Sequence, residues 1–197
     1  MDFEYEFERQ ERFAKRKKII LSILRWVIDV VLVVTLAYFF VLFAFERTNM
    51  SGASMETTLQ NGDVIIVNKL AYIIQEPKRF DVIVYNQESD EHNYYDIKRI
   101  IGLPGETVQI VKGVVCINGV PLEEPMITDA IEIGGTAQTE LTLEDDEYFV
   151  LGDNRNASED SRFAHVGNIV RSEVVGKAFI RTNNFAFVNT LNKYGKK

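Results

Sequence analysis

A run of twenty residues near the N-terminus, WVIDVVLVVTLAYFFVLFAF at residues 26–45, carries one charged residue, Asp29. A helix of this length rises about 30 Å, the thickness of the hydrocarbon core of a bilayer. The alternative is a buried core helix, but a helix that is apolar on every face needs a larger surrounding protein than the rest of this chain supplies. The run therefore predicts a transmembrane helix.

The flanks of this run predict its orientation. Between Glu46 and Ile65 the only basic residue is Arg47. Seven basic residues precede the run: Arg9, Arg12, Lys15, Arg16, Lys17, Lys18 and Arg25. The positive-inside rule then puts the N-terminus in the cytoplasm. A cleaved secretory signal has a shorter apolar stretch and a small-residue cleavage site, so the run reads as a permanent anchor. Residues 1–25 are expected to form a cytoplasmic tail, either as an amphipathic helix on the inner leaflet or as a solvated segment.

Beyond residue 46 the pattern changes to short runs of β-branched residues separated by turns. The runs are 64–67, 81–85, 107–111, 114–117 and 148–151. Lys112-Gly113 and Asn118-Gly119 suit tight hairpin turns. The pattern predicts a mainly β fold, with residues 46–197 as one extracytoplasmic domain of typical size. The acidic, weakly patterned stretch from 123 to 146 is expected to be an excursion between strands.

Composition excludes several classes of function. A net charge of −7 argues against nucleic-acid binding, which rests on Lys and Arg neutralising phosphates. Cys116 is the only cysteine and lies in an apolar run, so we expect a buried thiol and no intrachain disulfide. His92 and His165 are the only histidines, which leaves little for a zinc site or a Ser/His/Asp triad. We expect no metal and no cofactor.

Three segments carry side chains capable of catalysis. Ser54 lies in SGASMETTL at residues 51–59, where a serine is more often a turn residue or a helix cap. Lys98 lies in DIKRIIGLPG at residues 96–105, on the same strand face as Ile100, while Arg99 lies on the other face. Strand parity does not decide which face is buried. A buried Lys98 would be desolvated, which favours the neutral amine that a base requires.

The third segment is a polar loop, LGDNRNASEDSR at residues 151–162. As an ordinary surface loop it would make ion pairs of little value. It nevertheless offers acceptors for a lysine amine, and the candidates are Ser158, Asp153 and Asp160.

In this order behind a membrane anchor, these segments and GDVIIVNK at residues 62–69 resemble the successive motifs of type I signal peptidases. The similarity runs from the anchor to about Phe179. It implies a coiled antiparallel β fold with Ser54 as nucleophile and Lys98 as general base. It also implies that Ser158 hydrogen-bonds the lysine amine and that Asp160 and Arg162 form a supporting ion pair.

Three positions depart from the family pattern. Thr57 replaces a proline, so the turn after the nucleophile is expected to be less rigidly preset. Phe80 replaces a glycine before Asp81. Gly52 stands where some members have a serine that helps to bind the oxyanion, which leaves backbone N–H groups such as that of Ser54.

The sequence thus predicts a serine endopeptidase in a bacterial plasma membrane that cuts signal peptides from exported preproteins and acts as a monomer. The substrate is expected to pair as an extended strand with Gly52, Ala53, Asp96 and Ile97, with small side chains at the first and third residues before the cut. Two alternatives stay open at this point. One is a self-cleaving Ser/Lys regulator, which usually carries a DNA-binding module, and the other is an inactive scaffold with the same fold.

Overall fold

The computed structural model describes residues 2–88, 93–124, 127 and 129–188. It divides into two compact units, residues 1–43 and 44–197. The first unit contains all but the last residue of helix α1 (Asp2–Ala44), in which the apolar run and the segment before it are continuously helical. Its stretch Lys15–Ala44 is long and apolar enough to cross a membrane. The helix ends one residue before the predicted end, because Phe45 already begins the first strand.

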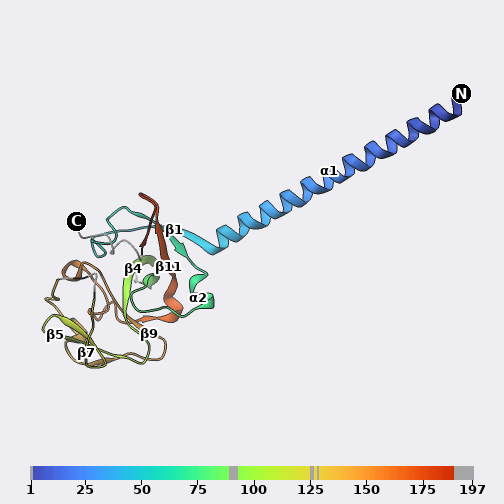
Figure 1. Cartoon of the computed structure of the whole chain (residues 1–197). Coiled ribbons are helices and arrows are strands. Elements are labelled where there is room, and N and C mark those ends of the chain that lie inside the picture. Colours follow the sequence, from blue (N-terminus) through green and yellow to red (C-terminus); the bar gives the residue numbers. More distant parts are fainter. Residues whose placement is uncertain (1, 89–92, 125–126, 128, 189–197) are drawn as a thin grey trace. The chain divides into compact units, whose positions relative to one another are not determined.

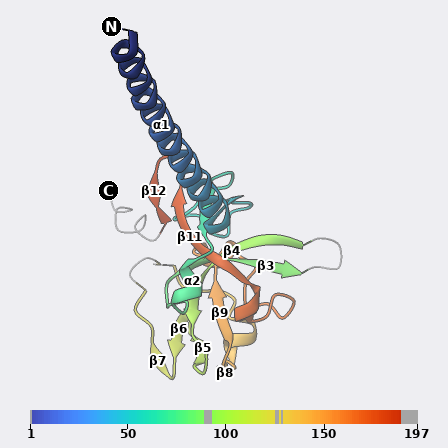
Figure 2. The ribbon, with the colours of Figure 1, turned by 90° about the vertical axis from the view of Figure 1, so that its right-hand side faces the viewer.

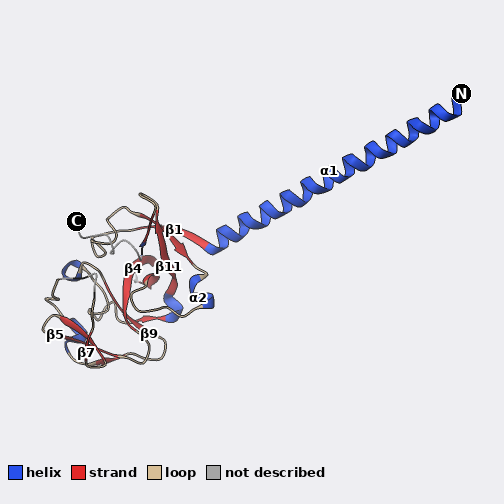
Figure 3. Ribbon diagram, viewed as in Figure 1, coloured by secondary structure: helices blue, strands red, loops and turns tan. Residues whose placement is uncertain are grey.

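The regular structure of the second unit consists mainly of antiparallel strands, which long loops connect (Figure 3). The larger sheet has eight strands in the order β1-β2-β11-β3-β4-β9-β10, with β12 pairing with β11. These strands are β1 (Phe45–Asn49), β2 (Val64–Asn68), β3 (Val82–Glu88), β4 (Asn93–Gly102), β9 (Glu147–Leu151), β10 (Ile169–Val170), β11 (Val174–Arg181) and β12 (Ala186–Phe187). Figure 1 marks β1, β4, β9 and β11 of this sheet. The prediction of a mainly β fold is confirmed.

The smaller sheet has four strands in the order β7-β6-β5-β8. They are β5 (Thr107–Val111), β6 (Val114–Ile117), β7 (Val120–Pro121) and β8 (Leu141–Thr142). Figure 2 shows β5, β6 and β7 side by side. The residues Lys112 and Asn118 both have positive φ, at 52° and 51°, as the predicted hairpin turns require.

Short helical segments complete this unit: α2 (Ala71–Ile74), η1 (Gly135–Gln138), η2 (Arg155–Ala157) and η3 (Arg171–Glu173). The acidic stretch 123–146 contains η1 and β8 among its described residues and otherwise runs as an excursion. Cys116 is buried and unbonded to another cysteine.

Strand β4 contributes to all three hydrophobic clusters of the domain. Ile97 packs in the cluster that also buries Met55 and Leu59, so this cluster anchors the turn around Ser54. Ile101 lies with residues of the smaller sheet, and Ile100 lies with side chains on the opposite face of the large sheet. Because both faces of β4 are covered, the polar side chains that it carries are held in fixed positions.

Candidate active site

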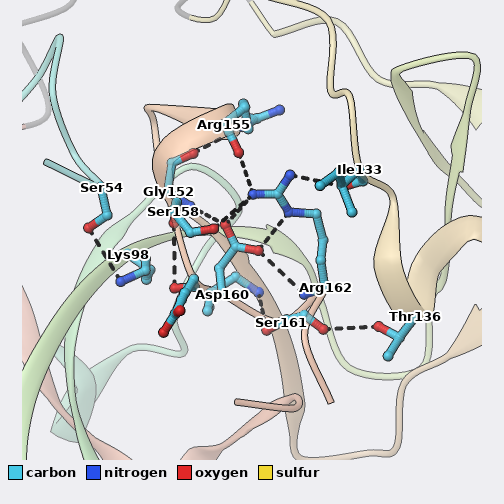
Figure 4. A network of polar contacts seen from close by, with 12 residues as sticks. Ser54, Lys98, Ile133, Thr136, Gly152, Arg155, Ser158, Asp160, Ser161 and Arg162 are labelled. Carbon is cyan, nitrogen blue, oxygen red and sulfur yellow. Dashed lines mark hydrogen bonds and ion pairs between the residues drawn. The ribbon is translucent and has the colours of Figure 1, made fainter. Parts of the chain in front are cut away.

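Ser54 and Lys98 meet in the structure. The Nζ atom of Lys98 lies 3.4 Å from the Oγ atom of Ser54 (Figure 4). Lys98 comes from the middle of β4 and is 2% exposed, so it points inward. Ser54 comes from the turn after β1, where the buried neighbour Met55 fixes the backbone. Two residues that are 44 positions apart are thereby brought together.

Asp96 is the second partner of the lysine amine. Its Oδ2 atom lies 2.5 Å from Lys98 Nζ. Residues two apart on a strand share a face, which brings this carboxylate beside the amine. Among the described residues, Ser54 and Asp96 are the hydrogen-bond partners of the amine, so a contact of Ser158, Asp153 or Asp160 with it stays a prediction. The Ser158 hydroxyl donates to the carbonyl oxygen of Glu159, at 3.5 Å.

Asp160 pairs with Arg162 instead of the amine. Its Oδ1 lies 2.7 Å from Arg162 Nε, so the ion pair implied by the resemblance is present. Asp160 also accepts the N–H of Gly152 at 3.0 Å, and Arg162 donates to the carbonyl oxygens of Ile133 and Arg155 (Figure 4). These buried hydrogen bonds fix the backbone conformation of the polar loop beside Ser54.

Asp153 is occupied by Arg99 on the other face of β4. Arg99 donates through Nε and Nη2 to the two carboxylate oxygens, and Thr58 also donates to Oδ2. Sequence parity left open which of Lys98 and Arg99 is buried, and the structure buries both. Arg99 and Thr58 were not among the predicted site residues. The sequence did contain a signal for this pair. Arg99 lies inside an apolar strand and Asp153 lies just after another, and two opposite charges in such positions favour a buried ion pair.

The polar loop also holds the backbone of the serine directly. Asn154 donates its backbone N–H to the carbonyl oxygen of Ser54 at 3.0 Å, and its side chain donates to the carbonyl oxygen of Ala53 at 3.2 Å. At Gly152 an added Cβ would lie 2.2 Å from Ser158 Oγ and 2.5 Å from Ser54 O. Only glycine leaves room there for the loop and the serine segment to approach so closely.

The turn that follows Ser54 was expected to be less rigid because Thr57 replaces a proline, but its backbone geometry is one that proline does not adopt. Thr57 adopts φ 88°, a value that the proline ring, fixed near −65°, cannot reach. The turn at Thr57 therefore has a geometry that excludes proline, so Thr57 does not simply loosen the same turn. The turn is fixed by Leu59, which is fully buried, and by the N–H of Leu59 bonded to the carbonyl oxygen of Met55.

A groove of about 280 Å³ runs past the two reactive side chains. Its lining comprises Asn49, Met50, Ser51, Gly52, Ala53, Ser54, Gln87, Tyr95, Asp96, Ile97, Lys98, Ala157 and Glu159. All four residues predicted to bind substrate line it.

Tyr95 and Glu46 form a side-chain hydrogen bond between β4 and β1, and this bond is the main cause that raises the pKa of Tyr95.

Among the described residues, no histidine lines the groove. His165 is 59% exposed and contacts Glu159, and His92 lies outside the described residues. In the part of the chain that the structure describes, no group of His, Cys, Asp and Glu side chains could hold a metal ion. The chemistry available is a hydroxyl, an amine and a carboxylate beside a peptide-sized groove.

Known proteins resemble this chain over most of its length. The model of the family described as "Signal peptidase, peptidase S26" matches residues 23–183. A probable signal peptidase I-2 of Synechocystis is 39% identical over 145 residues, which are 71% of this chain and 63% of that protein. Signal peptidase I of Bacillus licheniformis is 34% identical over 185 residues, 90% of this chain and 94% of that protein. A crystal structure of a signal peptidase I from Enterococcus faecalis V583 is 35% identical, covers 52% of this chain and 97% of that one, and gives a TM-score of 0.40.

These matches define the class as a serine peptidase, a hydrolase. The chain belongs to the signal peptidase, peptidase S26 family.

Proposed function

We propose that this chain is a membrane-bound endopeptidase that removes N-terminal signal peptides from exported preproteins, with Ser54 as nucleophile and Lys98 as general base. The observation that carries the proposal is the 3.4 Å contact between Lys98 Nζ and Ser54 Oγ at one wall of the groove. Catalytic hydrogen bonds are often long in a free enzyme and tighten when substrate is bound.

The reaction runs in two steps. The neutral amine of Lys98 takes the hydroxyl proton as Ser54 Oγ attacks the scissile carbonyl carbon, and the leaving amine takes that proton when the peptide bond breaks. The same amine then takes a proton from a water molecule as its oxygen attacks the acyl carbon, and it passes that proton to Ser54 Oγ when the ester bond breaks and the second product leaves. Burial of Lys98 supports this role because it holds the amine beside Ser54 Oγ and out of contact with bulk solvent.

The developing oxyanion is stabilised by the backbone N–H of Ser54, for which the described residues offer no acceptor. Each such donor contributes about 3 kcal/mol to the stability of the transition state. Gly52 brings no hydroxyl to this position. Its own N–H is bonded to Asn61 Oδ1 at 3.1 Å, which fixes the backbone that leads to the serine.

The substrate binds as an added strand in the groove. Strand β9 pairs with β4 only from Arg99 onward, so the edge of β4 from Tyr95 to Lys98 has no partner strand among the described residues on that side. An extended peptide supplies the missing backbone partner. Small side chains are expected at the first and third residues before the cut.

The apolar stretch Lys15–Ala44 anchors the chain in a bacterial plasma membrane, with its N-terminus in the cytoplasm. The peptidase domain then works outside the membrane as a monomer, where the ends of translocated signal peptides emerge.

The test uses the full-length protein in detergent or lipid and a preprotein that carries an Ala-x-Ala site. Ser54→Ala and Lys98→Ala are each expected to lower kcat/KM by about 10⁴-fold. Ser172→Ala and Lys78→Ala are matched controls, because both residues are exposed and lie away from the groove. Cleavage by the Ser54→Ala or Lys98→Ala protein at the wild-type rate rules out the proposed function.

A further inference from the structure

The carboxylate of Asp96 makes three contacts at the active site. Its Oδ1 accepts the backbone N–H of Ile97 at 2.8 Å, and its Oδ2 accepts from Lys98 Nζ at 2.5 Å and from the Tyr85 hydroxyl at 3.1 Å. The amine is thus much closer to this carboxylate than to Ser54 Oγ. A lysine in a charge-assisted hydrogen bond of this kind is an ammonium, which has no lone pair to accept a proton.

The N–H of Ile97 points toward the groove. Ile100 exchanges hydrogen bonds with Phe80 and Asp81 on the β3 side of the strand. Backbone groups alternate in direction along a strand, so Ile97 and Arg99 direct theirs to the opposite side. There Arg99 pairs with Leu151 of β9, whereas among the described residues the N–H of Ile97 has only the Asp96 carboxylate as acceptor. Asp96 therefore occupies the backbone donor that an added substrate strand would use.

We propose that Asp96 is a positioning residue that holds Lys98 inactive until a peptide is bound in the groove. The inference rests on the proposed function. A substrate carbonyl oxygen replaces Asp96 Oδ1 as the acceptor of the Ile97 N–H. Because the carboxylate is rigid and planar, the displacement of Oδ1 also moves Oδ2 away from Lys98 Nζ. The ammonium passes one proton to solvent, and the resulting neutral amine accepts the Ser54 hydroxyl proton during attack.

The other groups that face this amine leave Asp96 as the dominant charge. Tyr85 on β3 contributes a phenol hydroxyl. In the polar loop, Asp160 is neutralised by Arg162, and the side chain of Glu159 is 79% exposed. In the serine turn, Glu56 is exposed and accepts from Asn154.

The experiment compares two variants of Asp96 in the full-length protein. Asp96→Asn keeps the shape and an acceptor for the Ile97 N–H but removes the charge, whereas Asp96→Ala removes both. Asp145→Asn is the control, because it removes one carboxylate of the same kind from an exposed turn far along the chain. Values of kcat and KM are measured with an Ala-x-Ala peptide from pH 5 to pH 10.

The acidic limb of kcat/KM is expected to move to lower pH by about one unit or more in both Asp96 variants, since an adjacent opposite charge favours the charged amine by that amount. In Asp96→Ala, KM is also expected to fall about fivefold because the Ile97 donor is free. An acidic limb that coincides with those of the wild type and Asp145→Asn overturns the inference. The alanine variant gives the same readout if the asparagine variant does not fold. A fully active Ser54→Ala protein overturns the proposed function instead.

Discussion

The guanidinium of Arg99 and the carboxylate of Asp153 form a two-bond ion pair, with Nε to Oδ1 at 2.7 Å and Nη2 to Oδ2 at 2.6 Å. Both residues are under 5% exposed. Thr58 donates to the same carboxylate, and a third nitrogen of Arg99 donates to the carbonyl oxygen of Phe80. One buried pair therefore joins β4, the polar loop and the turn after Ser54, the three segments that carry the site.

Removing one side of this pair is expected to destabilise the fold strongly. Asp153→Ala leaves the Arg99 guanidinium buried without its counter-charge, and the expected loss in the free energy of unfolding is about 3–5 kcal/mol. Glu76→Ala is the control, because Glu76 is 82% exposed in its ion pair with Arg171 and such pairs contribute about 0–1 kcal/mol. Denaturant unfolding of the full chain in detergent measures both. Equal losses in the two variants would contradict this role.

The backbone at Thr57 predicts an order of stability among three residues. Glycine reaches φ 88° without strain, threonine does so at a cost of about 1–3 kcal/mol, and proline does not reach it. Thr57→Gly is expected to be at least as stable as the wild type, and Thr57→Pro to lose about 3 kcal/mol or more. Midpoints of thermal unfolding give the order. A proline variant as stable as the wild type would show that the turn geometry is wrong.

Gly152→Ala is expected to impair catalysis by displacing the serine segment. The new methyl group would overlap Ser158 and the carbonyl oxygen of Ser54, and such overpacking costs about 1–3 kcal/mol. Gly134→Ala is the matched control, since its only tight contact is with a movable side-chain carbon of Gln138. We predict that kcat falls at least tenfold in the first variant and stays near the wild-type value in the second. Full activity of Gly152→Ala would argue that Ser54 is not held by this contact.

Tyr72 provides a prediction about pH. Burial and the neighbouring Asp81 raise the pKa of Tyr72 above its ordinary value of about 10, and its hydroxyl donates to Asp81 at 3.0 Å. Because the pKa of Tyr72 is raised in the folded state, the stability that its protonated hydroxyl contributes is fully present below pH 10. That stability is lost as pH rises above 10, because the unfolded chain releases the proton first. The stability advantage of the wild type over Tyr72→Phe should therefore shrink between pH 9 and pH 11.5. An advantage that grows over this range contradicts the assignment.

The strand positions followed well from local sequence. Four predicted runs coincide with β2, β5, β6 and β9 to within one residue at each end. The fifth run, 81–85, corresponds to β3, which begins one residue later, at Val82, and extends to Glu88. β-Branched residues bounded by turn residues encode these elements locally. The pairing of strands distant in sequence, such as β2 with β11, depends on tertiary packing and could not be read from any window.

The two reactive residues of the site were predicted from the sequence, but the other residue that contacts the lysine amine was not. Ser54 and Lys98 emerged from the order of motifs, and the structure brings them together. The partners of the amine could not be assigned from the polar loop, because Asp153 and Asp160 are held by arginines whose burial is a tertiary property. Strand parity alone already placed Asp96 on the face of Lys98, and this was the overlooked local signal.

The most direct test of the account is the site at which an acylating serine probe built on an Ala-x-Ala peptide modifies the full-length protein, located by mass spectrometry of its peptides. We predict a single acyl adduct on Ser54. In Lys98→Arg the adduct should disappear although the fold is retained, because a guanidinium keeps the charge beside Asp96 and does not act as a base. An adduct on a different serine, or labelling of Ser54 at the wild-type rate in Lys98→Arg, would contradict the account.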